Sequence, residues 1–283
     1  VSVGGQIPNN LALKLDQNGV KILGTAAKDI DRAEDRSKFS NLLDRLEIEQ
    51  PRWSKLESVE KSKLFANRIG YPVLIRPSYV LSGSAMSVAY DESQLEDYLK
   101  KATEVSEDHP VVISKFMLNA REVEVDGVCD GNNVFIGAII EHVENAGVHS
   151  GDATMSLPAM TLDEITKEKI RRITRQIARD LCIKGPFNIQ YLVKNRDVYV
   201  IECNLRASRS MPFVSKAIGQ NLMELAACAM LGEKIEDGEG VTDRFGVKYP
   251  QFSFMRLEGA DPVTGVEMVS TGEVACFGRS FEE

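Results

Sequence analysis

One short stretch of the chain places acidic, amide and basic side chains at the end of an apolar run. The stretch reads VIECNLRASRS and covers residues 200–210. Because side chains on a strand alternate between its two faces, Glu202, Asn204 and Arg206 would point to one face and the apolar residues between them to the other. This predicted strand end could bind a metal ion and an anion, or it could hold an ordinary ion pair between Glu202 and Arg206.

The preceding residues predict a partner strand for this run. The sequence GPFNIQYLVKNRDVYVIECN reads as two β-rich runs joined by a turn. A three-residue turn would place Gln190 opposite Glu202 and Asn188 opposite Asn204, whereas a two-residue turn would place Gln190 opposite an apolar residue. The pattern therefore favours the three-residue turn, at residues 195–197.

The expected cluster contains oxygen ligands and neither His nor Cys. Gln190, Glu202 and Asn204 would supply carboxylate and amide oxygens, which suit a hard cation such as Mg²⁺ or Mn²⁺ that also binds nucleotide phosphates. Zinc is a poor match for this set.

Composition limits the class of protein. The chain has 283 residues, is 43% hydrophobic and carries a net charge of −8, so it can build a packed core but lacks the basic surface that nucleic acid or an anionic membrane requires. Apolar runs such as VFIGAII at 134–140 are too short to span a bilayer. Five scattered cysteines without a CxxC pair indicate a reduced compartment. The opening VSVGGQIPNN predicts a fragment of a longer protein, so the absence of a targeting peptide says nothing about its location.

The order of predicted elements indicates an α+β architecture with two lobes. Residues 1–24 read as the last βαβ step of a small α/β unit. One amphipathic helix is expected over 29–46. From this pattern alone, Arg36 is interpreted as a solvated charge on the helix. A strand pair around the turn at 130–133 would place Glu122, Glu124 and Asp126 on one face. A helix is expected over 163–181 and a last helix near 213–231, followed by a β-rich tail.

Two glycine-containing loops are candidate ligand contacts. YVLSGSAM at 79–86 follows Arg76 and contains Gly83, so its backbone N–H groups could approach phosphate, although most such loops bind nothing. AGVHSGD at 146–152 could form a polar pocket wall, or simply a long turn with a surface histidine. No Walker P-loop occurs in the sequence, and no nucleophile signature accompanies His149.

Six longer motifs together resemble one known family. EDRSKF, IRPSYVLSGSAM, SKFMLNAREVEVD, EHVENAGVHSGDA, GPFNIQYLV and VIECNLRASRSMPFVSK are similar to the ATP-grasp domain, and more narrowly to the second, carbamate-phosphorylating half of the carbamoyl phosphate synthetase large subunit of eukaryotes. The resemblance implies an α+β ATP-grasp fold in which two lobes clamp ATP. It would occupy residues 25–283 with a lid lobe at about 60–115, preceded by the end of a pre-ATP-grasp α/β domain at 1–24.

The resemblance also implies a reaction and roles for residues. The reaction is the ATP-dependent phosphorylation of carbamate to carbamoyl phosphate. Arg206, Arg209 and Asn204 would act at the phosphoryl acceptor, and Gln190, Glu202 and Asn204 would hold two Mg²⁺ or Mn²⁺ ions. The implied ATP contacts are Arg36, Arg76, Gly83, Lys115, Met117, Glu122, Gly147, Val148, His149, Ser150, Gln190 and Glu202.

Further expectations follow from the same resemblance. Glu122 and the loop 142–150 would hold K⁺ through backbone oxygens. Partners would be carbamate, ATP, the remaining synthetase domains and a glutaminase or other ammonia source, in the cytoplasm or alternatively the mitochondrial matrix. The rival interpretations are another ATP-grasp carboxylate ligase, or a nucleotide-binding regulatory or scaffold module without turnover.

Overall fold

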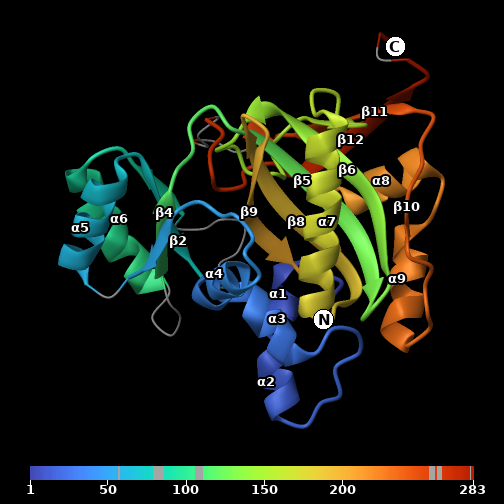
Figure 1. Cartoon of the computed structure of the whole chain (residues 1–283), viewed down its shortest axis with the longest axis horizontal. Coiled ribbons are helices and arrows are strands. Elements are labelled where there is room, and N and C mark those ends of the chain that lie inside the picture. Colours follow the sequence, from blue (N-terminus) through green and yellow to red (C-terminus); the bar gives the residue numbers. More distant parts are fainter. Residues whose placement is uncertain (57, 79–85, 106–110, 255–258, 260–262, 281) are drawn as a thin grey trace.

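The chain folds into a large and a small lobe joined along one side (Figure 1). This computed structural model describes every residue except 57, 79–85, 106–110, 255–258, 260–262 and 281. No helix among the described residues is long and apolar enough to cross a membrane.

A mostly antiparallel sheet forms the centre of the large lobe. Its strands, in spatial order, are β12 (Gly272–Gly278), β11 (Phe245–Gln251), β7 (Met155–Leu157), β6 (Val134–Asn145), β5 (Arg121–Asp130), β8 (Lys184–Lys194) and β9 (Asp197–Asn204), while β10 (Gly238–Glu239) pairs in parallel with β6. The long strands β5, β6 and β8 are buried along almost their whole length because helices cover both faces.

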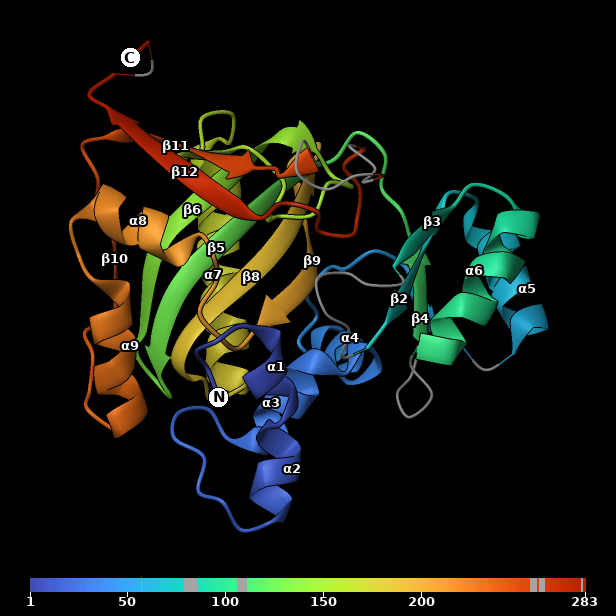
Figure 2. The same ribbon diagram turned by 180° about the vertical axis from the view of Figure 1, so that it is seen from behind.

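Two apolar cores fill the two faces of this sheet. One face packs against α3 (Ala27–Glu34), α4 (Arg36–Arg45) and α7 (Glu164–Asp180), and the short α1 (Gln6–Asn10) and α2 (Ala12–Gln17) lie beside them. The other face packs against α8 (Met211–Ile218) and α9 (Leu222–Leu231), which Figure 2 shows on the opposite side from α7. The α+β prediction is confirmed.

The small lobe has its own sheet and core. Its strands, in spatial order, are β1 (Trp53–Lys55), β4 (Val111–Lys115), β2 (Val73–Pro77) and β3 (Ser87–Ala89), all antiparallel. Helices α5 (Val59–Ile69) and α6 (Glu92–Val105) cover one face, and Ile75, Leu95 and Ile113 are buried between sheet and helices. The opposite face of this sheet is turned toward the large lobe (Figure 1).

The β8–β9 hairpin corrects the predicted turn but keeps the predicted pairs. Lys194 pairs with Asp197, so the turn holds two residues, Asn195 and Arg196, both with positive φ as in a type I′ turn. A β-bulge then skips Ile201, which restores Gln190 opposite Glu202 and Asn188 opposite Asn204. The three-residue turn was wrong because the extra residue lies in the strand instead.

Three other expected elements differ from the structure. The single helix over 29–46 is two helices, because Asp35 is extended and caps α4 by accepting from Lys38 N. The last helix is also two, divided where Gly219 takes a left-handed conformation and Asn221 caps α9. Residues 1–5 form no strand; Ser2 O instead accepts from Ala207 N at 2.9 Å.

The buried face of α7 should contribute strongly to stability. Ile177 is 0% exposed and packs under the large sheet, whereas Ile165 on the same helix is 73% exposed. Ile177→Ala should lower the free energy of unfolding by about 2–5 kcal/mol because it leaves a cavity. Ile165→Ala should change it by less than about 0.5 kcal/mol. Equal effects of the two substitutions in urea unfolding would contradict this packing.

Candidate active site

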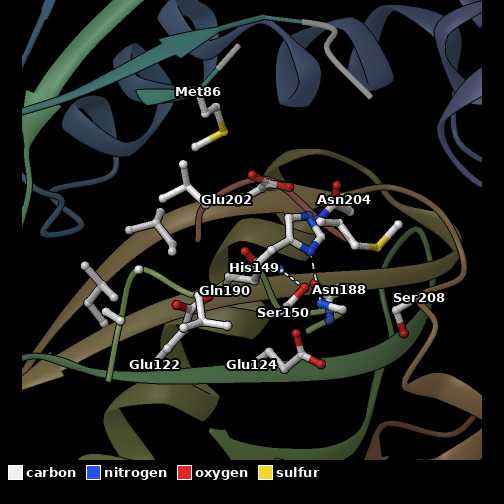
Figure 3. Close-up of a pocket in the computed structure, with 18 of the residues that line it drawn as sticks. Met86, Glu122, Glu124, His149, Ser150, Asn188, Gln190, Glu202, Asn204 and Ser208 are labelled. Atoms are coloured by element: carbon white, nitrogen blue, oxygen red, sulfur yellow. Dashed lines mark hydrogen bonds between the residues drawn. The ribbon is translucent and has the colours of Figure 1, made fainter. Parts of the chain in front are cut away.

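A pocket of about 400 Å³ lies between the two lobes. The small lobe contributes residues of β2 and β4 and Met86, and the large lobe contributes the ends of β5, β8 and β9 and the loops beside them. Figure 3 shows Met86 on the side of the small lobe, with Glu122 and Glu124 on the floor opposite. The predicted site residues that line this pocket are Arg36, Arg76, Lys115, Met117, Glu122, Gly147, Val148, His149, Ser150, Gln190, Glu202, Asn204, Arg206 and Arg209. Gly83 lies outside the described residues.

Glu202 is paired with Arg36, not with Arg206. Arg36 Nη2 lies 2.6 Å from Glu202 Oε2. Burial alone would raise the pKa of Glu202, but the charge and hydrogen bond of Arg36, with the charge of Arg76, outweigh burial and lower it to about 2. Glu202 is therefore a carboxylate at neutral pH.

The amide side chains complete the predicted oxygen cluster. Gln190 lies across the hairpin from Glu202 and donates through Nε2 to Ser150 Oγ at 3.1 Å, which leaves its carbonyl oxygen free of that bond. Asn204 Oδ1 accepts from Arg206 Nη2 at 3.1 Å. One ionised carboxylate with two amide oxygens fits Mg²⁺ or Mn²⁺. Among the described residues no three His, Cys, Asp or Glu side chains gather as a metal site.

Two basic residues reach the pocket from the small lobe. Arg76 donates through Nη2 to Ile201 O, the bulge residue, and its Nε is buried without a hydrogen-bond partner in the described part of the chain. Burial, reinforced by the charge of Arg36, lowers the pKa of Arg76 to about 9. Lys115 Nζ donates to Gly70 O and Tyr71 O at 2.9 and 3.0 Å. Both residues line the pocket, so their positive charge would attract an anionic group there.

The loop at 146–152 is a pocket wall and not a surface turn. His149 Nδ1 accepts from Gly151 N at 3.0 Å, and its backbone N donates to Gly265 O at 2.7 Å. Burial lowers the pKa of His149, so the imidazole is neutral at neutral pH. Gly147 has φ +117°, and a Cβ there would come within 2.9 Å of the Phe116 ring, so this position requires glycine.

Glu122 and Glu124 on β5 form the floor of the pocket, and Asp126 follows them along the strand outside the pocket lining. Burial raises the pKa of Glu122 to about 7, and burial next to Glu124 raises that of Asp126 to about 7. The hydroxyl of Ser210 lies 2.7 Å from an oxygen of both Glu124 and Asp126. Because a hydroxyl donates only one proton, a protonated Asp126 completes this network.

The two arginines after β9 are held by different parts of the chain. Arg206 Nε donates to Gln6 Oε1 at 2.9 Å, which ties it to α1. Arg209 Nη1 donates to Ser270 Oγ at 3.0 Å and contacts Met268 Sδ, so it lies toward the segment before β12. Both side chains still line the pocket.

Sequence reasoning missed two charged groups of the pocket, Glu34 and Lys248. Glu34 accepts from Gln6 Nε2 and Asn9 Nδ2, and burial raises its pKa to about 7. Lys248 is 1% exposed and donates to Ser150 O at 3.1 Å. The alternation along β11 could have placed Lys248 on one face, but nothing in the sequence marks that face as buried. With these two included, cationic side chains in the pocket outnumber carboxyls, which suits a polyanionic ligand.

The fold defines the class of protein. The structure superposes on a biotin carboxylase from Campylobacter jejuni, solved in a β-γ-ATP complex, with a TM-score of 0.79 and 19% identity over 96% of this chain and 68% of that one. N5-carboxyaminoimidazole ribonucleotide synthetase from Thermus thermophilus matches with a TM-score of 0.74 and 15% identity over 98% of this chain and 76% of that one. The chain has the ATP-grasp fold.

Sequence comparison defines the family. Residues 35–237 match the model of the carbamoyl-phosphate synthase L chain, ATP binding domain, and the chain belongs to that family. The multifunctional protein pyrABCN of Emericella nidulans is 56% identical over 99% of this chain, and the mitochondrial ammonia-type carbamoyl-phosphate synthase of Aquarana catesbeiana is 54% identical over 99%. The chain spans 12% and 19% of the lengths of these two relatives.

The buried acids predict a pH dependence of stability. Glu122 has a pKa of about 7 in the folded chain against 4.5 ordinarily, so the folded state binds more protons between these values. The contribution is fully present below pH 4.5 and is lost as the pH rises through 7. Glu122→Gln should therefore reduce the fall in unfolding free energy between about pH 5 and 8 by roughly 1–3 kcal/mol.

The matched control for this measurement is Glu168→Gln. The Glu168 side chain is 70% exposed on α7, so its replacement should leave the pH dependence unchanged. Urea unfolding at several pH values measures both variants. A Glu122→Gln curve parallel to that of the unsubstituted chain would show that Glu122 does not hold its proton at neutral pH.

Proposed function

We propose that this chain phosphorylates carbamate with ATP, giving carbamoyl phosphate and ADP, as the second synthetase unit of a carbamoyl phosphate synthetase. The observation that carries the proposal is the arrangement at the end of β9. There an ionised carboxylate and two amide oxygens lie beside two arginines, inside a pocket with an excess of cationic groups. Such an arrangement of charged and amide groups suits phosphoryl transfer, because that reaction depends on positioning and charge neutralisation more than on covalent catalysis.

The nucleotide would occupy the space between the lobes. Arg36, Arg76 and Lys115 line this space and supply positive charge for the phosphates. Met117, Glu122 and the segment Gly147–Ser150 would form the rest of the nucleotide contacts. Gly83, which lies outside the described residues, would add backbone contacts to the phosphates.

Gln190, Glu202 and Asn204 would hold Mg²⁺ or Mn²⁺. When bound there, the ion would supply positive charge against the phosphates. The chain's part is to keep Glu202 ionised through Arg36 and Arg76, and to fix the two amides against the carboxylate through the β8–β9 register. A monovalent ion such as K⁺ would lie at Glu122 and residues 142–150.

Arg206 and Arg209 would bind the phosphoryl acceptor. Carbamate is already an anion, so its oxygen can attack phosphorus without a general base, and the arginines offset the repulsion between two anions. His149 is neutral and has accepted a backbone hydrogen bond, so it would contact the ligand without carrying charge. The small lobe would close to exclude water, in which carbamate decomposes.

The cellular setting is a proposal drawn from the relatives. Residues 1–24 would belong to a preceding domain, and 25–283 would form the ATP-grasp unit. Carbamate would come from another synthetase domain, supplied with ammonia by a glutaminase or from solution. The chain would act in the cytoplasm or in the mitochondrial matrix, the second alternative being that of a relative whose name includes 'mitochondrial'.

The proposal is tested by turnover in both directions. ADP formation from ATP and Mg²⁺ should increase when freshly generated carbamate is added, and ATP should form from ADP and carbamoyl phosphate. Glu202→Ala should lower both rates on the order of 10²-fold or more. Glu236→Ala, an exposed acid beyond α9, should leave both rates unchanged.

The rival interpretations predict other outcomes. Stimulation of ADP formation by a different carboxylate, and not by carbamate, would identify another ATP-grasp ligase. Tight ATP binding without turnover in either direction would favour a regulatory or scaffold module. A folded sample that fails to bind ATP would refute the pocket assignment itself.

A further inference from the structure

The side chain of Arg206 is anchored by a residue two hundred positions away. Its Nε donates to Gln6 Oε1 at 2.9 Å, Nη2 donates to Asn204 Oδ1 at 3.1 Å, and Nη1 reaches Ala207 O at 3.4 Å. A guanidinium carries one N–H on Nε and two on each Nη. The Gln6 contact therefore uses the Nε donor and leaves an N–H on each Nη for a ligand in the pocket.

Gln6 is itself fixed in one orientation. Its Nε2 donates to Glu34 Oε2 at 2.7 Å and to Asn10 Oδ1 at 2.8 Å. Both amide hydrogens are thus used, so the carbonyl oxygen must point toward Arg206. Asn9 Nδ2 holds the other Glu34 oxygen at 2.6 Å. A rotated Gln6 amide would turn N–H groups against the donor of Arg206.

The backbone beside this contact also links the N-terminal segment to the residues that follow β9. Ala207 N donates to Ser2 O at 2.9 Å, beside the Arg206–Gln6 bond. Figures 1 and 2 both place α1 next to the end of β9. The segment before α2 therefore reaches the pocket with a side chain, and Gln6 and Glu34 both line it.

We propose that Gln6 and Glu34 are positioning residues for Arg206: Glu34 orients the Gln6 amide, and Gln6 holds the guanidinium so that its Nη groups face the phosphoryl acceptor. This inference rests on the proposed function in one respect, the identity of the acceptor. The chain of contacts from Glu34 through Gln6 to Arg206 predicts that the acceptor's affinity depends on the N-terminal helix, while the nucleotide's affinity does not.

The kinetic test compares Gln6→Ala with Ile7→Ala in the reverse reaction. Ile7 is on the same short helix and is 62% exposed, so Ile7→Ala controls for disturbance of α1. Gln6→Ala should raise the KM for carbamoyl phosphate about tenfold, the equivalent of about 1.4 kcal/mol, with less than a twofold change in the KM for ADP. Equal changes in both KM values, or no change in either, would overturn the proposal.

A double-mutant cycle tests the role of Glu34. If Glu34 acts through Gln6, Glu34→Ala should reproduce the KM change and the double variant should be no worse than Gln6→Ala alone. Additive effects would show that Glu34 acts by another route. Gln6 is only half-buried, so Gln6→Ala retains its value as a test even where Glu34→Ala fails to fold.

A third measurement is independent of turnover. In proton–nitrogen NMR spectra of the arginine side chains, the Nε–H of Arg206, assigned by its loss in Arg206→Lys, should exchange with water at least tenfold faster in Gln6→Ala than in Ile7→Ala. Unchanged exchange would overturn the positioning role. A chain without turnover in either direction that still shows this difference would refute the proposed function and leave the positioning contact intact.

Discussion

The ion pair between Glu202 and Arg36 is the contact on which the pocket depends. It joins the end of β9 to the first residue of α4. The backbone N of Arg36 donates to Ser78 Oγ and Arg76 donates to Ile201 O, so the small lobe attaches at the same point. A buried carboxylate or guanidinium without a partner is strongly unfavourable. The charges needed for ligand binding therefore also hold the two lobes together.

The predicted ligand pairs could be read from alternation because the buried face of a strand fixes its register. A hairpin that placed Gln190 opposite Ile201 would put polar and apolar side chains on the same face, which the core under β8 and β9 does not allow. The length of the turn was less constrained by the sequence pattern. A two-residue turn with a bulge and a three-residue turn without one give the same pairs from residue 202 onward, so the pattern of ligand pairs could not distinguish the two turns.

Glu34 and Lys248 escaped prediction for physical reasons. Glu34 lies on α3, where Asp29 is buried, Lys28 is exposed and Glu34 itself is half-buried, so the helix pattern does not mark Glu34 as a pocket residue. Its hydrogen-bond partners Gln6 and Asn9 come from a separate helix. On β11 the usual pattern is reversed: Lys248 faces the pocket, while Val247 and Tyr249 on the other face are 44% and 59% exposed. Local hydrophobicity would assign the opposite face to the core. Only the tertiary contact of Lys248 with Ser150 O reveals its position.

The distribution of charge explains how an acidic chain can hold a polyanion. The whole chain has a net charge of −8, but cationic side chains outnumber carboxyls in the pocket. The excess of negative charge therefore lies outside the pocket. Two of the pocket carboxyls, Glu34 and Glu122, have pKa values raised by burial to about 7, so they cancel less of the positive charge than ordinary carboxylates would. Glu202, with a pKa of about 2, remains fully ionised. An anion that binds Arg36 alone would leave Glu202 without a partner, and a cation that binds Glu202 alone would leave Arg36 without one. When both ligands bind, each of the two buried charges is paired again, and two ion pairs replace one.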